Sequence, residues 1–401
     1  MRIAEHRYIR YSRYSHHPRR HFITLVALAL TLSSLTACRP TDGTPDDSGK
    51  PVLSPMSAEE ARAIKIDDSR PGAVSPLPTR SGPLHLDITC DIDAPSALVK
   101  HDNQGDVVWA KKTTPRISGV CTSETMTPQS AAVRLLFTST SGYAVVSPDT
   151  RYASFILLPS NATSDNRLPG DKRTRDFTIA DQRAYVVVIE TETGRTVRTE
   201  EVKGLILGQV LTNDTLAVET SQAYYPGGNG HGTITTYSLA KPTAKATTIP
   251  TDKWLVGATQ DSLLLAPSNM SQGRYGTQPL TRLSEGGDVV GTIAGVTDVY
   301  RGGWVERVRD AGTAPPKDSA SGPPQTVPTE LVHLDSGVTT DVAGLKVKEV
   351  ALPTAAGLLV SQETSTGEGQ NRKTTSTPQF WLSADDDGHP HTENLEQFST
   401  K

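Results

Sequence analysis

The densest group of residues that could do chemistry is the segment DDDGHPH, Asp385–His391. Carboxylates and imidazoles bind divalent cations, which makes Asp385, Asp387, His389 and His391 the candidate metal ligands of the chain. The three acids are consecutive, however, whereas a calcium loop alternates its ligands with other residues. The spacing therefore favours a polar hairpin turn, with a cation site as the alternative.

The chain offers little else for catalysis. It contains no G-x-S-x-G nucleophile turn, no H-E-x-x-H zinc motif and no phosphate-binding Walker loop. The glycine-rich segment Gly227–Gly232 lacks the Lys-Ser/Thr pair of such a loop, so we expect an ordinary loop there. The sequence predicts no catalytic residue and no cofactor, and we do not expect an enzyme.

Cys90 and Cys121 are two of the three cysteines in the chain. In an exported protein, an even pair of cysteines most simply forms one disulfide. Two buried free thiols are the alternative. A metal site is not expected from these two alone, because a zinc site needs further ligands.

The third cysteine, Cys38, ends the segment LTAC and follows the apolar run Phe22–Leu35. That run is shorter than the about 20 apolar residues of a membrane-spanning helix. A basic start, a short apolar run and small residues at its end are typical of a secretory signal peptide. LTAC also resembles the lipobox of bacterial lipoproteins, which implies cleavage before Cys38 and acylation of its thiol with a lipid such as palmitate-bearing diacylglycerol. A plain secretory signal and an uncleaved anchor are the alternatives.

The segment RRHFI, Arg19–Ile23, resembles the twin-arginine export motif, so export by that route or by the general secretory route is open. The predicted signal peptide as a whole resembles the signal peptides of actinobacterial surface lipoproteins. This resemblance implies an exported protein of the cell envelope, anchored by its lipid to the outer face of the cytoplasmic membrane.

Composition divides the chain into three parts. Residues 1–37 form the predicted signal peptide, and residues 38–83 are rich in Pro, Ser, Gly and Asp, which predicts a flexible tether. Within the tether, Ser57 and Glu60 have the spacing of a capping box, which predicts a short helix that docks on the domain or forms transiently. Residues 84–401 form the predicted β-domain.

The β-domain is a repeat of short strands. Runs rich in Val, Ile, Leu and Thr alternate with turn residues, and helical periodicity is almost absent. Six hairpin turns recur, spaced by 46 to 51 residues after the second. Their centres are Gly105, Gly194, Lys241, Gly287, Gly337 and Gly388. A period in the forties with four strands per unit is typical of β-propeller blades.

The pattern predicts an all-β fold, a β-propeller of six or seven four-stranded blades. Six blades follow from the hairpins, and the wide interval between Gly105 and Gly194 leaves room for a seventh. We expect a strand near one terminus to complete the blade at the other, because an open sheet edge invites aggregation.

One segment carries a family resemblance. VVSPDTRYASFILL, Val145–Leu158, resembles the blade motif of TolB-type, WD40-like propellers, with Ser147, Pro148, Asp149 and Tyr152 at the matching positions. The motif covers about a dozen residues, whereas the periodicity covers residues 84–401. The resemblance implies the propeller architecture and no particular activity.

These observations favour a lipid-anchored propeller that binds an envelope protein or an extracellular ligand. The formal net charge is −4 and no basic patch is present, which argues against a nucleic-acid partner. Insertions between the strands supply loops, where binding sites usually lie. We expect a monomer. The alternatives are an accessory factor of a membrane complex or sensor kinase, and a propeller enzyme with its site in the central channel.

Overall fold

The computed structural model describes eleven segments of the chain, all within the compact unit Ser48–Lys401. They are residues 50–64, 76–87, 95–115, 144–157, 183–221, 232–268, 277–309, 328–351, 356–366, 373–383 and 388–395. The predictions for Cys38, Cys90, Cys121, Asp385 and Asp387 fall outside these segments. They therefore stay predictions.

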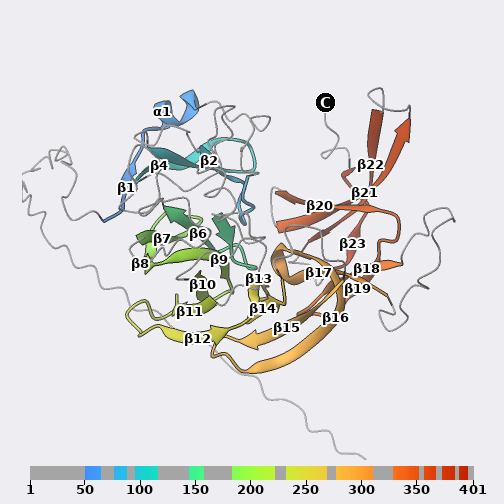
Figure 1. The fold of residues 1–401 in the computed structure, drawn as a ribbon. Coiled ribbons are helices and arrows are strands. Elements are labelled where there is room, and N and C mark those ends of the chain that lie inside the picture. The colour runs from blue at the N-terminus through green and yellow to red at the C-terminus, as the bar shows by residue number, and fades with distance from the viewer. Residues whose placement is uncertain are drawn as a thin grey trace, which may run out of the picture. The chain divides into compact units, whose positions relative to one another are not determined.

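The described residues form five antiparallel sheets, whose strands lie side by side in Figure 1. In spatial order, the first sheet contains β1 (Val52–Pro55), β4 (Val107–Thr114), β3 (Ser96–His101) and β2 (Leu84–Asp87). The second contains β5 (Ala144–Val146), β6 (Tyr152–Leu157), β7 (Arg183–Glu190) and β8 (Thr196–Lys203). The third contains β12 (Thr247–Thr251), β11 (Gly232–Ser238), β10 (Thr215–Ser221) and β9 (Leu205–Leu211).

The other two sheets complete the β-propeller. The fourth contains β13 (Trp254–Ala258), β14 (Ser262–Ala266), β15 (Gln278–Ser284), β16 (Val289–Tyr300), β17 (Trp304–Val308), β18 (Thr329–His333) and β19 (Thr339–Asp341). The fifth contains β20 (Lys346–Ala351), β21 (Ala356–Thr366), β22 (Lys373–Ser383) and β23 (Pro390–His391).

The long strand β16 belongs to two four-stranded units. Its first half pairs with β15, and its second half, from Val296 onward, pairs with β17. The register shifts between Val296 and Asp298, where such an irregularity bends and twists a strand. Six units can thus be counted among the described strands. Residues 116–143 lie outside them, so the choice between six and seven blades stays a prediction.

The predicted hairpin turns are confirmed. Each of the six joins two neighbouring strands of one sheet, and its central glycine, where there is one, has a positive φ. A positive φ costs glycine little conformational energy, because glycine has no Cβ. These residues are Gly105, Gly194, Gly287, Gly337 and Gly388.

The turn between β5 and β6 is built as its Ser-Pro-Asp motif predicts. The Ser147 hydroxyl donates to Asp149 Oδ1 at 2.6 Å, and Asp149 Oδ1 also accepts from the Arg151 backbone N–H at 3.0 Å. The Tyr152 N–H donates to Ser147 Oγ at 3.0 Å. A short carboxylate that bonds nearby backbone groups is the usual reason for Asp in a turn.

Neighbouring sheets share hydrophobic cores. Ile156 and Val186 of the second sheet pack in one cluster with Leu207 and Leu216 of the third. Similar clusters join the first sheet to the second, the third to the fourth, and the fourth to the fifth. The strand β6 is buried at every position, as expected when both faces of a strand are covered.

The N-terminal segment differs from the expected flexible tether. Part of it, β1, forms the outer edge of the first sheet, with Val52 opposite Thr114 and Pro55 opposite Lys111. The helix α1 (Ala58–Ala63) has the predicted Ser57 and Glu60 capping box. It docks through Ala61, which is buried in a cluster with Val99 and Ala110. The physical reason is that β1 covers an otherwise open edge of β4.

The expected closure between the terminal blades stays a prediction, because residues near both ends of the chain lie outside the described segments. The strand β1 pairs within the first sheet and not with the last one, and β23 pairs with β22 alone among the described strands. The long inserted segments lie between the second and third strands of their units. Examples are residues 158–182, between β6 and β7, and residues 310–327, between β17 and β18.

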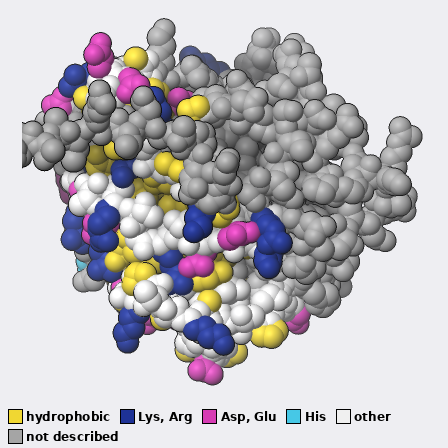
Figure 2. Space-filling view, turned by 90° about the vertical axis from the view of Figure 1, so that its left-hand side faces the viewer, with side chains coloured by type: hydrophobic (Ala, Val, Ile, Leu, Met, Phe, Trp, Pro, Cys, Tyr) yellow, Lys and Arg dark blue, Asp and Glu magenta, His cyan; other side chains and the backbone are white. Residues whose placement is uncertain are grey.

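Two surface observations complete the description. No helix among the described residues is long and apolar enough to cross a membrane. Figure 2 shows one face on which basic and acidic side chains are interspersed over the described part, with hydrophobic side chains between them. Charges of mixed sign produce no strong field for long-range attraction of a polyanion.

Candidate functional site

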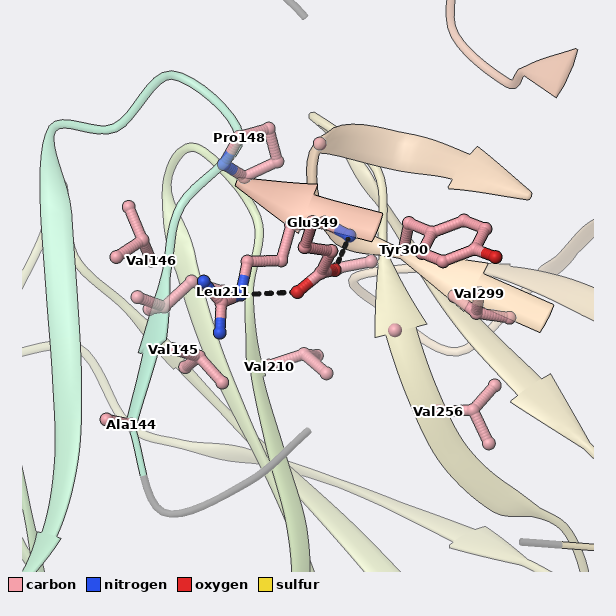
Figure 3. A pocket seen from close by; sticks show the side chains of 14 residues that line it. Ala144, Val145, Val146, Pro148, Val210, Leu211, Val256, Val299, Tyr300 and Glu349 are labelled. Atoms are coloured by element: carbon pink, nitrogen blue, oxygen red, sulfur yellow. Dashed lines mark hydrogen bonds and ion pairs between the residues drawn. The ribbon is translucent and has the colours of Figure 1, made fainter. Parts of the chain in front are cut away.

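A small cavity opens where the inner strands of several sheets converge. It has a volume of about 90 Å³ and is lined by β5, β9, β13, β16, β20 and the 3-10 helix η2 (Arg301–Gly303). Figure 3 shows Val145 and Val146 on one side of it and Val256 and Val299 on the other. Inner strands of propeller blades surround the central channel, so this cavity is part of that channel.

The cavity walls are mostly apolar. Val210 and Val256 are buried at 4% and 3% exposure. Val210 belongs to the core cluster between the third and fourth sheets, and Val256 to a cluster within the fourth sheet. Valine suits such walls because its branched side chain favours the extended backbone of a strand. The valine walls are therefore fixed by the same packing that holds the strands together, and their side chains carry no hydrogen-bonding group.

One ion pair lies at the cavity and joins two units. The Arg301 backbone N–H donates to Glu349 Oε1 at 2.7 Å, and Arg301 Nε lies 3.3 Å from Glu349 Oε2. Figure 3 shows Glu349 reaching in from β20, with both interactions drawn as dashed lines. The pair thus fixes the start of η2 against the fifth sheet.

A glycine-rich turn places the arginine there. β16 ends at Tyr300, and Gly302 and Gly303 then have φ of 74° and 80°. The Gly302 carbonyl lies 3.0 Å from His333 Nε2, and the Gly303 carbonyl accepts from the Leu334 N–H at 2.9 Å. These bonds hold the turn that carries Arg301 away from the strand and into the cavity.

The Arg301 guanidinium has N–H donors that no described residue accepts from. Its Nε faces Glu349, and no acceptor among the described residues bonds its two terminal nitrogens. The side chain is 32% exposed. A guanidinium presents a planar fork of donors that fits a carboxylate or a phosphate. The cavity can therefore bind an anionic group.

The two strands that flank η2 carry acidic side chains, Asp298 on β16 and Glu306 on β17. The Tyr300 hydroxyl donates to Glu306 Oε2 at 2.9 Å, and burial raises the pKa of Tyr300. Burial also raises the pKa of Asp298, with a smaller contribution from the negative charges of Glu306 and Glu349. These shifts follow from a low-dielectric wall with little positive charge nearby.

The lining does not form a catalytic arrangement. The ionisable residues that line the cavity, as far as the structure describes it, are Tyr300, Arg301 and Glu349. A nucleophile and a base within hydrogen-bond reach are the minimum for covalent catalysis. Of these three residues, Tyr300 donates its hydroxyl to Glu306 and Glu349 is engaged by Arg301, so no described hydrogen bond joins a nucleophile of the lining to a base of the lining. What the arrangement can do is bind.

The predicted Asp/His cation site is only partly described. His389 is exposed, and the His391 ring stacks on Trp381 with 4.2 Å between ring centroids. His391 Nδ1 lies 2.9 Å from Glu393 Oε1. No three His, Cys, Asp or Glu side chains within the described segments are placed to hold a metal ion. Within the described half of the hairpin, His391 packs on Trp381, and the cation site stays a prediction.

Sequence reasoning missed Arg301 and Glu349. Neither belongs to a motif, and they are far apart in the chain, so only the fold brings them together. The nearest signal is the Gly-Gly pair after Arg301, at the end of an apolar strand. Such a pair indicates an abrupt turn, at which the preceding side chain points away from the strand.

Comparisons with known proteins add weak likenesses to propellers. No protein-family model matches the chain, and no curated protein matches its sequence. Among solved structures, TolB from Acinetobacter baumannii is 12% identical over 77% of this chain and 63% of its own, with a TM-score of 0.31. BamB from Moraxella catarrhalis is 9% identical over 84% and 90%, with a TM-score of 0.32.

An acylaminoacyl peptidase from Pyrococcus horikoshii is 11% identical over 83% of this chain, with a TM-score of 0.43. The chain spans 47% of the length of that peptidase and of a second acylaminoacyl peptidase structure. None of these likenesses says what this chain binds or does.

Proposed function

We propose that this protein is a lipid-anchored binding module of the cell envelope, which holds a protein partner at its channel. In this proposal, residues 1–37 are a cleaved signal peptide and Cys38 carries the lipid. The propeller then stands on the outer face of the cytoplasmic membrane. One observation carries the binding role: a channel cavity with rigid apolar walls and a single arginine that has unused donors.

The cavity suits an acidic group presented by a larger molecule. At about 90 Å³ it is smaller than the usual pocket for a small-molecule ligand, so it fits the tip of a partner segment. A carboxylate that entered would meet the free edge of the Arg301 guanidinium, and the valine walls would exclude water from the contact. Charge-assisted hydrogen bonds are stronger when water is excluded.

The test is capture of partners in the native cells. The full-length, lipidated chain is cross-linked, purified and compared with an Arg301→Glu variant, which repels a carboxylate. We expect the variant to recover at least about tenfold less of the partner, equivalent to about 1.4 kcal/mol of binding free energy.

Arg183→Glu is the matched control, because Arg183 forms an exposed ion pair with Glu201 on the second sheet, at 3.2 Å. It should recover the partner as the wild type does, and Arg301→Lys should recover an intermediate amount. Equal recovery by wild type and Arg301→Glu would contradict the channel site. Turnover of a substrate by the purified protein would contradict the binding role itself.

A further inference from the structure

A groove runs between the third and fourth sheets and shares no lining residue with the channel cavity. It has a volume of about 630 Å³, and its apolar lining residues are Ile249, Pro250, Leu265, Leu283 and Val289. Val289 is 68% exposed, so the apolar surface continues to the outside. A mostly apolar depression of roughly 300–1,000 Å³ is the usual size of a small-molecule site.

A buried carboxyl with an unused oxygen lies beside this groove. Glu219, on β10, is 0% exposed. Its Oε2 accepts a hydrogen bond from the Leu255 N–H at 2.8 Å, whereas its Oε1 has no partner among the described residues. A buried polar atom without a partner is costly and rare in folded proteins.

Gly232 is the residue between this oxygen and the groove. It lines the groove, and a Cβ at its position would lie 2.6 Å from Glu219 Oε1 and 3.0 Å from Glu219 Cγ. The backbone of Gly232 is not among those with positive φ, so its conformation does not require glycine. The absence of a side chain at Gly232 therefore leaves the space next to Glu219 Oε1 unfilled, and any other residue would fill it.

Among the described residues, no cationic side chain pairs with Glu219. Burial raises the pKa of its carboxyl to about 7, and the Leu255 hydrogen bond opposes this shift. The charged residues of the groove are Asp252 and Lys253, and the Lys253 ammonium donates to Thr281 Oγ1 at 2.7 Å. On β15, Arg282 pairs instead with Asp261 and Asp335. Apart from Glu219 itself, the strands β10 to β14 contain no charged side chain.

We propose that this groove binds an aliphatic ammonium ion, whose N–H donates to Glu219 Oε1 and whose hydrocarbon stem packs along the apolar groove wall. The cation stabilises the ionised carboxylate, so binding of the ammonium releases the proton of Glu219. The occupant is a small molecule, because the volume of about 630 Å³ is that of a small-molecule site and the carboxyl next to Gly232 offers one unused oxygen.

The test uses n-butylammonium as the probe on the full chain. Methyl-resolved NMR at pH 8 reports on Ile249 and Leu283, and we expect their signals to shift in a saturable titration. n-Butanol, which has the same stem and no charge, should bind at least tenfold more weakly. Binding at pH 5.5 should be about thirtyfold weaker than at pH 8, because a carboxyl with a pKa near 7 is almost fully protonated there.

Two variants test whether the carboxylate of Glu219 binds the ammonium group. Glu219→Gln keeps the shape and should abolish the preference for the ammonium over butanol, and Gly232→Ala should weaken both. Asp252→Asn is the matched control and should leave binding unchanged. Loss of binding in Asp252→Asn alone, or equal binding of butanol and butylammonium by the wild type, would overturn the proposal. Equal binding of the two probes would mean that the carboxyl of Glu219 does not contact the ligand.

Discussion

Glu219 is an acid that the fold keeps in an apolar interface. It sits between the third and fourth sheets, whose shared core contains Ala217, Ile234, Leu255 and Leu263. Such a site disfavours the charged form of a carboxyl and stabilises the neutral one. Glu219 therefore makes the free energy of unfolding depend on pH in a range where most carboxyl groups are already ionised.

The sign of this linkage follows from the two pKa values. The pKa of Glu219 is about 7 in the folded protein and 4.5 as a free side chain. Its stabilising contribution is therefore fully present below pH 4.5 and is lost as the pH rises through 7. The loss amounts to about 3 kcal/mol for a difference of this size.

We therefore predict that Glu219→Gln flattens the stability profile. Denaturant unfolding of the wild type between pH 4.5 and 8 should show a fall in unfolding free energy that the variant lacks. The variant should be the more stable protein at pH 8. Glu201→Gln, at an exposed position, should keep the wild-type slope. Parallel profiles for wild type and Glu219→Gln would contradict this prediction.

At the scale of elements, the hairpin turns are alike in conformation and differ in surroundings. Gly105 and Gly194 both have positive φ, at 89° and 65°. A Cβ on Gly105 would meet nothing within 4 Å, whereas one on Gly194 would lie 2.9 Å from Trp109 Cδ2 and 3.0 Å from Lys111 Cε. The turn of the second sheet thus packs directly on β4 of the first.

This difference predicts unequal costs for the same substitution. Gly105→Ala should lose about 1–2 kcal/mol of unfolding free energy, the cost of a left-handed backbone for a residue with a Cβ. Gly194→Ala should lose about 1–3 kcal/mol more, because the added methyl overpacks the contact with Trp109. Denaturant melts of both variants check this, with Gly337→Ala as a second open turn. Equal losses at Gly105 and Gly194 would show that the turn can move away from β4.

The sequence is informative about these elements because their signals are local. A glycine in a tight hairpin, the Ser147 turn and the Ser57 capping box each involve a few consecutive residues, and each was predicted correctly. The pairing of β1 with β4 was not predicted, because nothing in residues 52–55 specifies a partner sixty residues later. The channel residues Arg301 and Glu349 were missed for the same reason.

At the scale of the whole molecule, polar contacts link turns of successive four-stranded units, the last two of which belong to the fourth sheet. The Asp149 N–H donates to Asn213 Oδ1 at 3.0 Å, and the Asn213 N–H donates to the Gln260 carbonyl at 2.9 Å. The Gln260 N–H then donates to Asp335 Oδ2 at 3.0 Å. Each contact satisfies a backbone group that would otherwise be left at a sheet end.

The proposed membrane anchor also concerns the whole molecule, and a single substitution tests it. We predict that Cys38→Ala leaves the propeller folded, because Cys38 precedes residues 84–401, in which the sequence predicts the β-domain. The variant should lack the lipid and move from the membrane fraction to the soluble fraction of the envelope. Intact mass of the purified protein and immunoblots of the fractions measure this. Unchanged retention in the membrane would contradict the role of Cys38.

The strand β16 has a consequence for how this chain can evolve. Repeat proteins gain and lose units by recombination, and the breakpoints are best tolerated in the surface loops between units. No loop exists between the two units of the fourth sheet, because one strand serves both. A breakpoint there would cut a twelve-residue strand. These two units are therefore expected to be inherited as one block, while the boundaries on either side stay open to insertion and deletion.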